Sequence, residues 1–196
     1  MKYALIGDIH SSKEDLEKVL RQIKLEEPKA KIIGTGDLFE CTISKKKITD
    51  EKFKALQEVM LNPEGFKELL TFPSVFGNQE ERILHITALA DPLRTWMKGL
   101  AETISIGNAE VIHGHQWKWG GEPWSLLKAH ADKQITFFGH SHLSGLSIDG
   151  HWREITFDRP YDVCYGKVLV NVGAVVKARE WVLYDAEEQT VIFKKA

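Results

Sequence analysis

The sequence predicts an α/β fold in a single domain that spans residues 1–196. The first observation is a strand–loop–helix unit at the start of the chain, with polar residues placed where the strand ends. The second is that several later strand-like runs also end in a glycine followed by a polar cluster. The third is that no repeat, low-complexity tract or linker divides the chain.

The first unit begins with residues 3–6, a short apolar run that reads as a buried strand and leads to Asp8 and His10. Ser11 and Ser12 are candidate N-caps, and the acidic residues at 14 and 15 are placed for a capping box. The next apolar residues recur at helical spacing and predict one buried helix face. They are Leu16, Val19, Leu20 and Ile23.

The middle of the chain is predicted to contain two more strands, 31–34 and 72–76, which lead to Asp37 and Asn78. Between them lie a polar loop, 40–47, an amphipathic helix over 53–60 and a second helix from Asn62-Pro63 to residue 70. A helical pattern then passes through residues 83 and 86, and a short helix runs from Asp91-Pro92 to Gly99.

The second half is predicted to be rich in β-structure. Residues 103–106 and 109–112 flank Gly107-Asn108, which indicates a hairpin whose second strand leads to His113. After a helix near 125–131, the strand 135–138 leads to Gly139-His140-Ser141-His142. In an extended backbone His140 and His142 share one face and point into one pocket. Two further hairpins are expected, around 149–150 and 186–189.

Composition limits the classes of function. The chain is 43% hydrophobic and 28% charged, as in ordinary globular proteins, and its formal net charge of −2 gives no support for general nucleic-acid binding. No apolar run is long enough to span a bilayer, and no secretory signal precedes the first strand, so we expect a cytoplasmic protein. Cys41 and Cys164 are expected to be buried, reduced thiols.

The polar clusters at the strand ends supply the ligands of a predicted metal site. All are oxygen or imidazole donors, which favours manganese, iron, zinc or nickel. They are Asp8, His10, Asp37, Asn78, His113, His140 and His142. This set is too large for one tetrahedral site, but it suffices for two metal ions if Asp37 bridges them with its two oxygens.

These motifs resemble those of the calcineurin-like metallophosphoesterase family, in the family's order and over nearly the whole chain. They are Asp8-Ile-His10, Gly36-Asp37, Gly77-Asn78, His113-Gly114 and Gly139-His-Ser-His142. The stretch 171–174, Asn-Val-Gly-Ala, also looks like the late turn of the family's small bacterial and archaeal phosphodiesterase-like members.

The resemblance implies two packed mixed β-sheets flanked by helices, the four-layer sandwich of metallo-dependent phosphatases. It also implies two metal ions, with manganese the expected one. One ion would be held by Asp8, His10, Asp37 and His142, and the other by Asp37, Asn78, His113 and His140.

The sequence departs from the family at Gln79. Family members commonly carry a histidine there that contacts the phosphate and protonates the leaving group, whereas glutamine has no titratable proton. The arginine-rich motif that protein phosphatases carry after Gly-Asp is also absent, since Leu38-Phe-Glu-Cys41 follows Asp37. Both departures favour a phosphodiesterase that acts on a small phosphate ester through a metal-bridging hydroxide. The alternatives are a non-catalytic scaffold of the same fold and a phosphomonoesterase or protein phosphatase.

Further residues are weaker candidates. His115 is the candidate to replace the missing histidine as catalyst, and the alternative is a role behind the ligands or in solvent. Trp117 and Trp119 are candidate substrate-binding residues, with packing in the core or between subunits as the alternative. Asn78 is expected to contact substrate as well as metal. Lys45-Lys-Lys47 could attract a phosphorylated substrate, and Glu80 reads as a helix N-terminal charge. The remaining histidines, His85, His130 and His151, read as surface or packing residues, and a homo-oligomer stays open.

Overall fold

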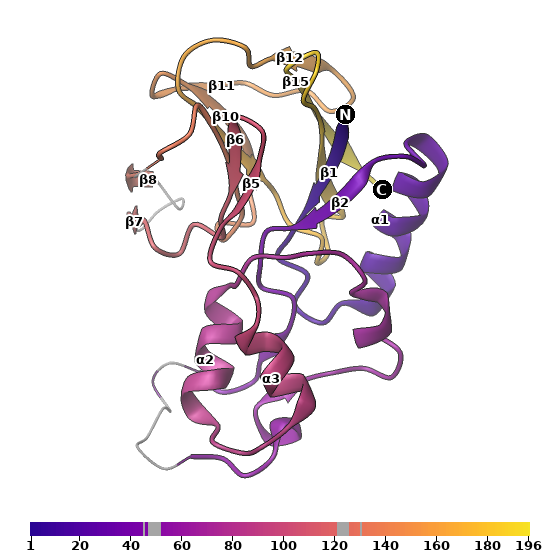
Figure 1. The fold of residues 1–196 in the computed structure, drawn as a ribbon, viewed down its shortest axis with the longest axis vertical. Coiled ribbons are helices and arrows are strands. Elements are labelled where there is room, and N and C mark those ends of the chain that lie inside the picture. Colours follow the sequence, from indigo (N-terminus) through magenta and orange to yellow (C-terminus); the bar gives the residue numbers. More distant parts are fainter. Residues whose placement is uncertain (45, 47–51, 121–125, 130) are drawn as a thin grey trace.

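The computed structural model describes residues 1–44, 46, 52–120, 126–129 and 131–196. Two mixed β-sheets pack face to face, with strand orders β12-β15-β14-β1-β2 and β11-β10-β13-β9-β6-β5 (Figure 1). The α/β class with two packed mixed sheets and flanking helices is therefore confirmed.

The first sheet consists of β1 (Lys2–Ile6), β2 (Lys31–Gly34), β12 (Pro160–Asp162), β14 (Glu180–Asp185) and β15 (Thr190–Lys195). The second consists of β5 (Ile104–Ile106), β6 (Ala109–Val111), β9 (Ile135–Phe138), β10 (Ser144–Ile148), β11 (His151–Arg153) and β13 (Val168–Val172). The helices are α1 (Lys13–Glu26), α2 (Asn78–Ile86) and α3 (Pro92–Lys98), with 3-10 turns at Leu56–Glu58 and Lys67–Leu69. Two short ribbons pair β3 (Glu40–Cys41) with β4 (Met60–Leu61), and β7 (Lys118–Trp119) with β8 (Leu126–Lys128).

Alternation along β1 explains the packing of the first sheet. Leu5 joins Phe137 and Val170 in the apolar cluster between the two sheets. Its neighbours Ala4 and Ile6 point the other way and pack with residues of α1, which covers the outer face of this sheet (Figure 1). Every one of these side chains is fully buried, so β1 is anchored on both faces and holds the loop after it in place.

The direction of the strands decides where polar residues gather. Strands β1 and β2 are parallel, and so are β6, β9 and β13. Their carboxyl ends therefore meet at one end of the sandwich, next to the amino end of α2. A direct link between the sheets exists there, since the backbone N–H of His140 donates to Asp8 Oδ2 at 2.9 Å.

Most predicted elements are confirmed. The first strand and helix, the second strand, α2, α3, the strand 135–138 and all three hairpins lie where the pattern indicated. Asp91 caps α3 by accepting the backbone N–H groups of Leu93 and Arg94. Ser12 is the N-cap of α1, but no capping box forms, because its hydroxyl donates to the carboxylate of Asp15 at 2.7 Å.

Five predicted elements are wrong in whole or in part. Residues 53–60 form a 3-10 turn and β4, and the second helix shrinks to the turn Lys67–Leu69. A 3-10 turn repeats every three residues, so it explains the spacing of Phe53, Leu56 and Val59 as well as a helix does. The strand 72–76 makes only isolated bridges, Ser74 with Gly34 and Val75 with Ala101. The described part of 125–131 contains β8, and the loop 40–47 begins with β3.

The remaining expectations concern the burial of the two cysteines and helices that could cross a membrane. Both cysteines are free, and Cys41 is buried as expected, whereas Cys164 is exposed. No helix in the described part of the chain combines the length and the apolar character needed to cross a bilayer.

Candidate metal centre

The first group of donors consists of Asp8, His10 and His142, whose nearest donor atoms all lie within 4.8 Å of one another. Asp8 and His10 lie in the loop after β1, and His142 lies in the loop after β9. The Nε2 atoms of the two histidines are 3.1 Å apart, and Nε2 of His142 is 3.5 Å from Asp8 Oδ1. Nδ1 of His10 faces Glu40 Oε2 at 2.5 Å, so its Nε2 is the ring atom turned to the group.

The second group consists of Asp37, His113 and His140, also within 4.8 Å. His113 is fully buried and donates its Nδ1–H to the carbonyl oxygen of Thr35 at 2.8 Å. This hydrogen bond fixes the tautomer, and the Nε2 lone pair then faces Asn78 Oδ1 at 3.1 Å and Asp37 Oδ2 at 3.3 Å. Asn78 therefore lies beside this group.

Asp37 lies between the two groups. Its Oδ2 is 3.7 Å from Nε2 of His10 in one group and 3.3 Å from Nε2 of His113 in the other. Its Oδ1 is turned away and accepts the backbone N–H of Gln79 at 2.8 Å. Both oxygens of Asp37 were expected to bridge the two metal ions, but Oδ2 is the oxygen that faces both groups.

The backbone at these donors is unusual. Asp8, His10, Asp37, His140 and His142 all have positive φ, between 48° and 71°. Each such residue costs roughly 1 kcal/mol or more, and such conformations cluster at functional sites. The extended His-Ser-His segment predicted from alternation is therefore wrong. A tight turn, in which the N–H of Ser141 donates to the carbonyl of Gly139 at 2.9 Å, sends His140 to one group and His142 to the other.

The amino end of α2 holds the loop after β2. Glu80 is fully buried, and its carboxylate accepts the backbone N–H groups of Asp37, Phe39 and Gly77. The side-chain oxygen of Gln79 accepts the N–H of Cys41 at 3.1 Å. Gly77 is required here, because a Cβ at this position would collide with Asp37. Glu80 thus positions the metal-site loop from behind.

The carboxylates give the centre a strongly negative potential. Burial lowers the pKa of His10, but its contacts with Asp8 and Glu40 outweigh this effect and raise it to about 10. Burial likewise opposes a raised pKa at His113, yet the charge of Asp37 brings it to about 9. Burial and the neighbouring His113 lower the pKa of His140 to about 4, and burial together with the charge of Asp37 raises that of Glu80 to about 7. Such a potential attracts cations.

The donor atoms fit divalent metal ions. Asp8 Oδ1 is buried and accepts no hydrogen bond from the described residues, which is costly for a carboxylate unless a cation lies beside it. The Nδ1 atoms of His10 and His113 are engaged with Glu40 and Thr35, as in metal-binding histidines. Oxygen and imidazole donors without thiolate suit manganese, iron or zinc.

The other candidates differ in position. The ring of His115 lies 5.3 Å from that of His113, and its Nε2 is 3.8 Å from Glu81 Oε2.

Trp117 is buried against Phe138, which favours packing over substrate contact. Trp119 is half-buried, 5.7 Å from the ring of His140, and donates its indole N–H to the carbonyl of Gly114. His85 and His151 are exposed. Of the residues named from the sequence, Lys45, Lys47 and His130 lie outside the described residues.

An open pocket of about 650 Å³ lies over the two groups and contains four residues that the sequence analysis did not select. These are Glu40, Arg82, Val176 and Lys177. Glu40 follows Asp37 by three residues, and Arg82 follows Asn78 by one helical turn, so spacing could have indicated both. No pattern pointed to Val176 and Lys177, because contacts with distant segments bring them here, such as the hydrogen bonds from Val176 N–H to the carbonyl of Asp8 and from Lys177 N–H to Asp15.

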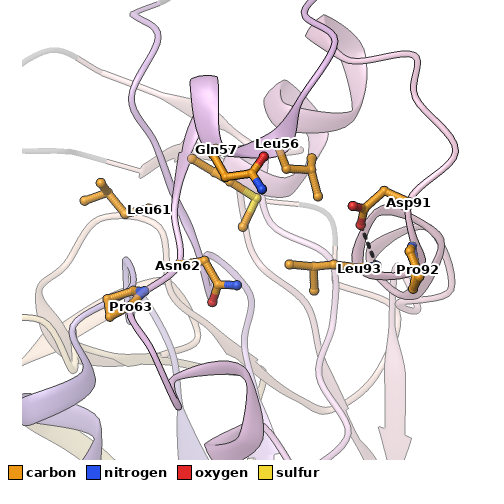
Figure 2. Close-up of a pocket in the computed structure, with 9 residues that line it drawn as sticks. Leu56, Gln57, Leu61, Asn62, Pro63, Asp91, Pro92 and Leu93 are labelled. Atoms are coloured by element: carbon orange, nitrogen blue, oxygen red, sulfur yellow. Dashed lines mark hydrogen bonds between the residues drawn. The ribbon is translucent and has the colours of Figure 1, made fainter.

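A second hollow, of about 740 Å³, lies between residues 56–63 and the start of α3 (Figure 2). Leu56, Met60 and Leu93 give it an apolar lining. Asp91 is the acidic residue there, and its carboxylate is engaged in capping α3, as the dashed line to Leu93 shows. None of the predicted site residues lies in this hollow, and we assign it no chemistry.

Two packed mixed sheets, with carboxylate and imidazole donors gathered where the strands end, are the arrangement expected of a metal-dependent hydrolase. The calcineurin-like phosphoesterase superfamily domain matches residues 1–189, and the chain belongs to this superfamily. The resemblance seen in the motifs is thereby confirmed, and the chain is an enzyme of the phosphoric ester hydrolase class.

Solved structures share the fold at low identity. A metallophosphoesterase from Sphaerobacter thermophilus is 16% identical with a TM-score of 0.67, over 100% of this chain and 88% of that one. A second structure, of a protein described as a proposed diadenosine tetraphosphatase, is 15% identical with a TM-score of 0.57, over 100% of this chain and 93% of that one. At such identities the likeness shows the fold alone. No curated protein matches the chain.

Proposed function

We propose that this enzyme is a phosphodiesterase that uses two divalent cations, with manganese the expected metal. The observation that carries the proposal is the position of Asp37 Oδ2, which faces Nε2 of His10 and Nε2 of His113 in two separate donor groups. One carboxylate oxygen that faces two donor groups suits a pair of metal ions, which lie ~3.5–4 Å apart in two-metal sites.

The protein holds the donors of each group ready. Glu40 orients His10, the carbonyl of Thr35 orients His113, and the N–H of Gln79 holds the Oδ1 side of Asp37 so that Oδ2 stays between the groups. When bound, the two cations supply Lewis acidity toward the phosphoryl oxygens and acidify an attacking water. The side-chain amide of Asn78 lies beside His113 and is placed to contact both metal and phosphate.

Gln79 favours diesters over monoesters. Its side chain has no titratable proton, and its oxygen is engaged with the N–H of Cys41. Protonation of a poor leaving group would therefore have to come from another residue, and His115, next to His113, is the nearest candidate. The scaffold alternative is disfavoured, because a protein without catalysis has no physical reason to keep seven donors and a strained backbone at five of them.

The test combines metal content with hydrolysis of bis(4-nitrophenyl) phosphate. Protein dialysed with manganese should hold close to two equivalents per chain and hydrolyse the diester. Asp37→Ala should lose both ions and the activity, whereas His113→Ala should weaken mainly one ion. His151→Ala replaces an exposed histidine and serves as the matched control. One ion that remains tightly bound in Asp37→Ala would contradict the shared carboxylate.

A further inference from the structure

The pocket over the donor groups contains two basic side chains from separate elements. Arg82 comes from α2 and Lys177 from the connection between β13 and β14. The proposed chemistry assigns neither a task, because the metal donors are all carboxylate, amide or imidazole. Within the described part of the chain, neither side chain forms an ion pair. Several other lysine and arginine side chains there do form ion pairs.

Arg82 lies on the side of the pocket next to Asn78 and Asp37. It is one helical turn after Asn78, so both side chains project from the same face of α2. Within the described residues its Nε is buried without a hydrogen-bond partner, and its Nη1 lies 3.4 Å from the carbonyl oxygen of Ile43. The guanidinium lines the pocket, and such a group is well suited to bind a phosphate through two parallel hydrogen bonds.

Lys177 lies on the side of the pocket next to Asp8. The N–H of its neighbour Val176 donates to the carbonyl of Asp8 at 3.1 Å, which joins this connection to the loop after β1. Lys177 has a positive φ of 64°, and its own N–H is held by Asp15 Oδ2 at 2.9 Å. The fold thus keeps an exposed lysine at the rim of the pocket at the cost of backbone strain.

The net charge of the metal-loaded site can accommodate more than one anionic group. Asp8, Asp37 and Glu40 are the carboxylates of the centre, and two divalent cations outweigh them. A simple phosphodiester brings one negative charge, which the cations already attract. Arg82 and Lys177 add two more positive charges to the same pocket, and a second phosphate on the substrate is an anion that these charges would attract.

We infer that the substrate is a phosphodiester that carries a second phosphate, which Arg82 binds through two parallel hydrogen bonds and Lys177 attracts from the rim of the pocket. This inference rests on the proposed function, because it requires that the reacting phosphate lies at the two donor groups. It adds the substrate class: the ester substituent is itself phosphorylated.

The experiment compares two esters that differ only in the second phosphate. They are the 4-nitrophenyl ester of thymidine 5′-phosphate and the same ester with a 3′-phosphate, both hydrolysed by the manganese-loaded enzyme with release of nitrophenolate. We expect a KM roughly tenfold lower for the ester with the 3′-phosphate, which corresponds to about 1.4 kcal/mol, because Arg82 makes charge-assisted hydrogen bonds to this phosphate. Added salt should reduce this preference.

Variants assign the preference to the two residues. Arg82→Gln should remove most of it, Arg82→Lys should keep part of it, and Lys177→Gln should remove less because that side chain is exposed. Arg153→Gln replaces an exposed arginine on β11 and is the matched control. Thermal melting checks that each variant is folded, and Lys177→Gln decides the matter if Arg82→Gln does not fold.

Calorimetry gives a second measurement that does not depend on turnover. The metal-loaded protein should bind thymidine 3′,5′-bisphosphate more tightly than thymidine 5′-phosphate, and Arg82→Gln should lose the difference. Equal affinities in the wild type, or equal KM values for the two esters, overturn the inference and leave the phosphodiesterase proposal standing. Absence of metal binding and of hydrolysis of both esters instead overturns the proposed function.

Discussion

Glu40 is expected to influence metal affinity through a single contact with His10. Its carboxylate lies 2.5 Å from Nδ1 of His10 and so fixes the ring with Nε2 toward the donor group. Loss of such a partner typically weakens metal binding about 10–100-fold. We therefore expect Glu40→Ala to weaken one of the two manganese ions in a calorimetric titration, while Glu40→Gln, which keeps an accepting oxygen, loses less.

Glu64→Ala replaces an exposed carboxylate elsewhere on the surface and should leave both affinities unchanged. The role of Glu40 would be purely structural under a different outcome. In that case Glu40→Ala and Glu40→Gln would lose the same affinity for both ions, and both variants would also lose thermal stability.

Gln79 decides which leaving groups are accepted. A general acid is typically worth about 10²–10⁴-fold for a poor alkoxide leaving group, whereas a nitrophenolate leaves without one. The enzyme should therefore hydrolyse aryl diesters readily and alkyl phosphomonoesters poorly. Gln79→His should recover part of the missing factor for alkyl esters with little change in metal content, as measured by kcat/KM for paired esters. If the wild type prefers alkyl monoesters, another acid is present, and His115→Ala is the next variant to measure.

At the scale of elements, Asp15 ties helix α1 to the connection between β13 and β14. Its carboxylate accepts hydrogen bonds from Ser12 Oγ, the backbone N–H of Lys177 and Nε of Arg179. Burial opposes ionisation, but these partners prevail and lower the pKa of Asp15 below its usual value. We expect Asp15→Asn to reduce the free energy of unfolding by about 2 kcal/mol at neutral pH.

The sign of the pH dependence follows from the lowered pKa. Asp15 stabilises the fold above the pKa of the unfolded chain, about 3.9, and this contribution is lost as the pH falls through the lower folded value. The difference in unfolding free energy between wild type and Asp15→Asn should thus be constant above about pH 5 and shrink below about pH 4. Glu14→Gln, beside it but exposed and paired with Lys18, should change stability little. A difference that persists at pH 3 would contradict the role of the charge.

The elements also show what sequence can and cannot predict here. Periodicity was sufficient for α1 and for the hairpin at Gly107-Asn108, because their signals are local. It failed over 53–60, where a 3-10 turn and a strand use the same apolar spacing as a helix. Motifs located the donors, yet they could not show that a tight turn parts His140 from His142, nor that the connection after β13 brings Lys177 to the pocket. Those features depend on contacts between distant segments.

At the scale of the whole molecule, metal binding should couple to folding because the donors come from both sheets. A ligand that binds only the folded state at 100 times its Kd adds about 2.7 kcal/mol of stability. Chelation of the metal-loaded enzyme should therefore lower the Tm by several degrees in a calorimetric scan. Asp37→Ala should show no such response, and an equal decrease in that variant would mean that the chelator acts elsewhere.

The division of the donors along the chain has a consequence for splitting the protein. Asp8, His10, Asp37 and Asn78 precede the connection between α3 and β5, whereas His113, His140 and His142 follow it. Each donor group takes residues from both sides of this point. Two fragments made by dividing the gene there would each lack a complete donor group, and their reassociation would recreate both groups at once. Metal uptake would then serve as a signal of complementation between the two fragments.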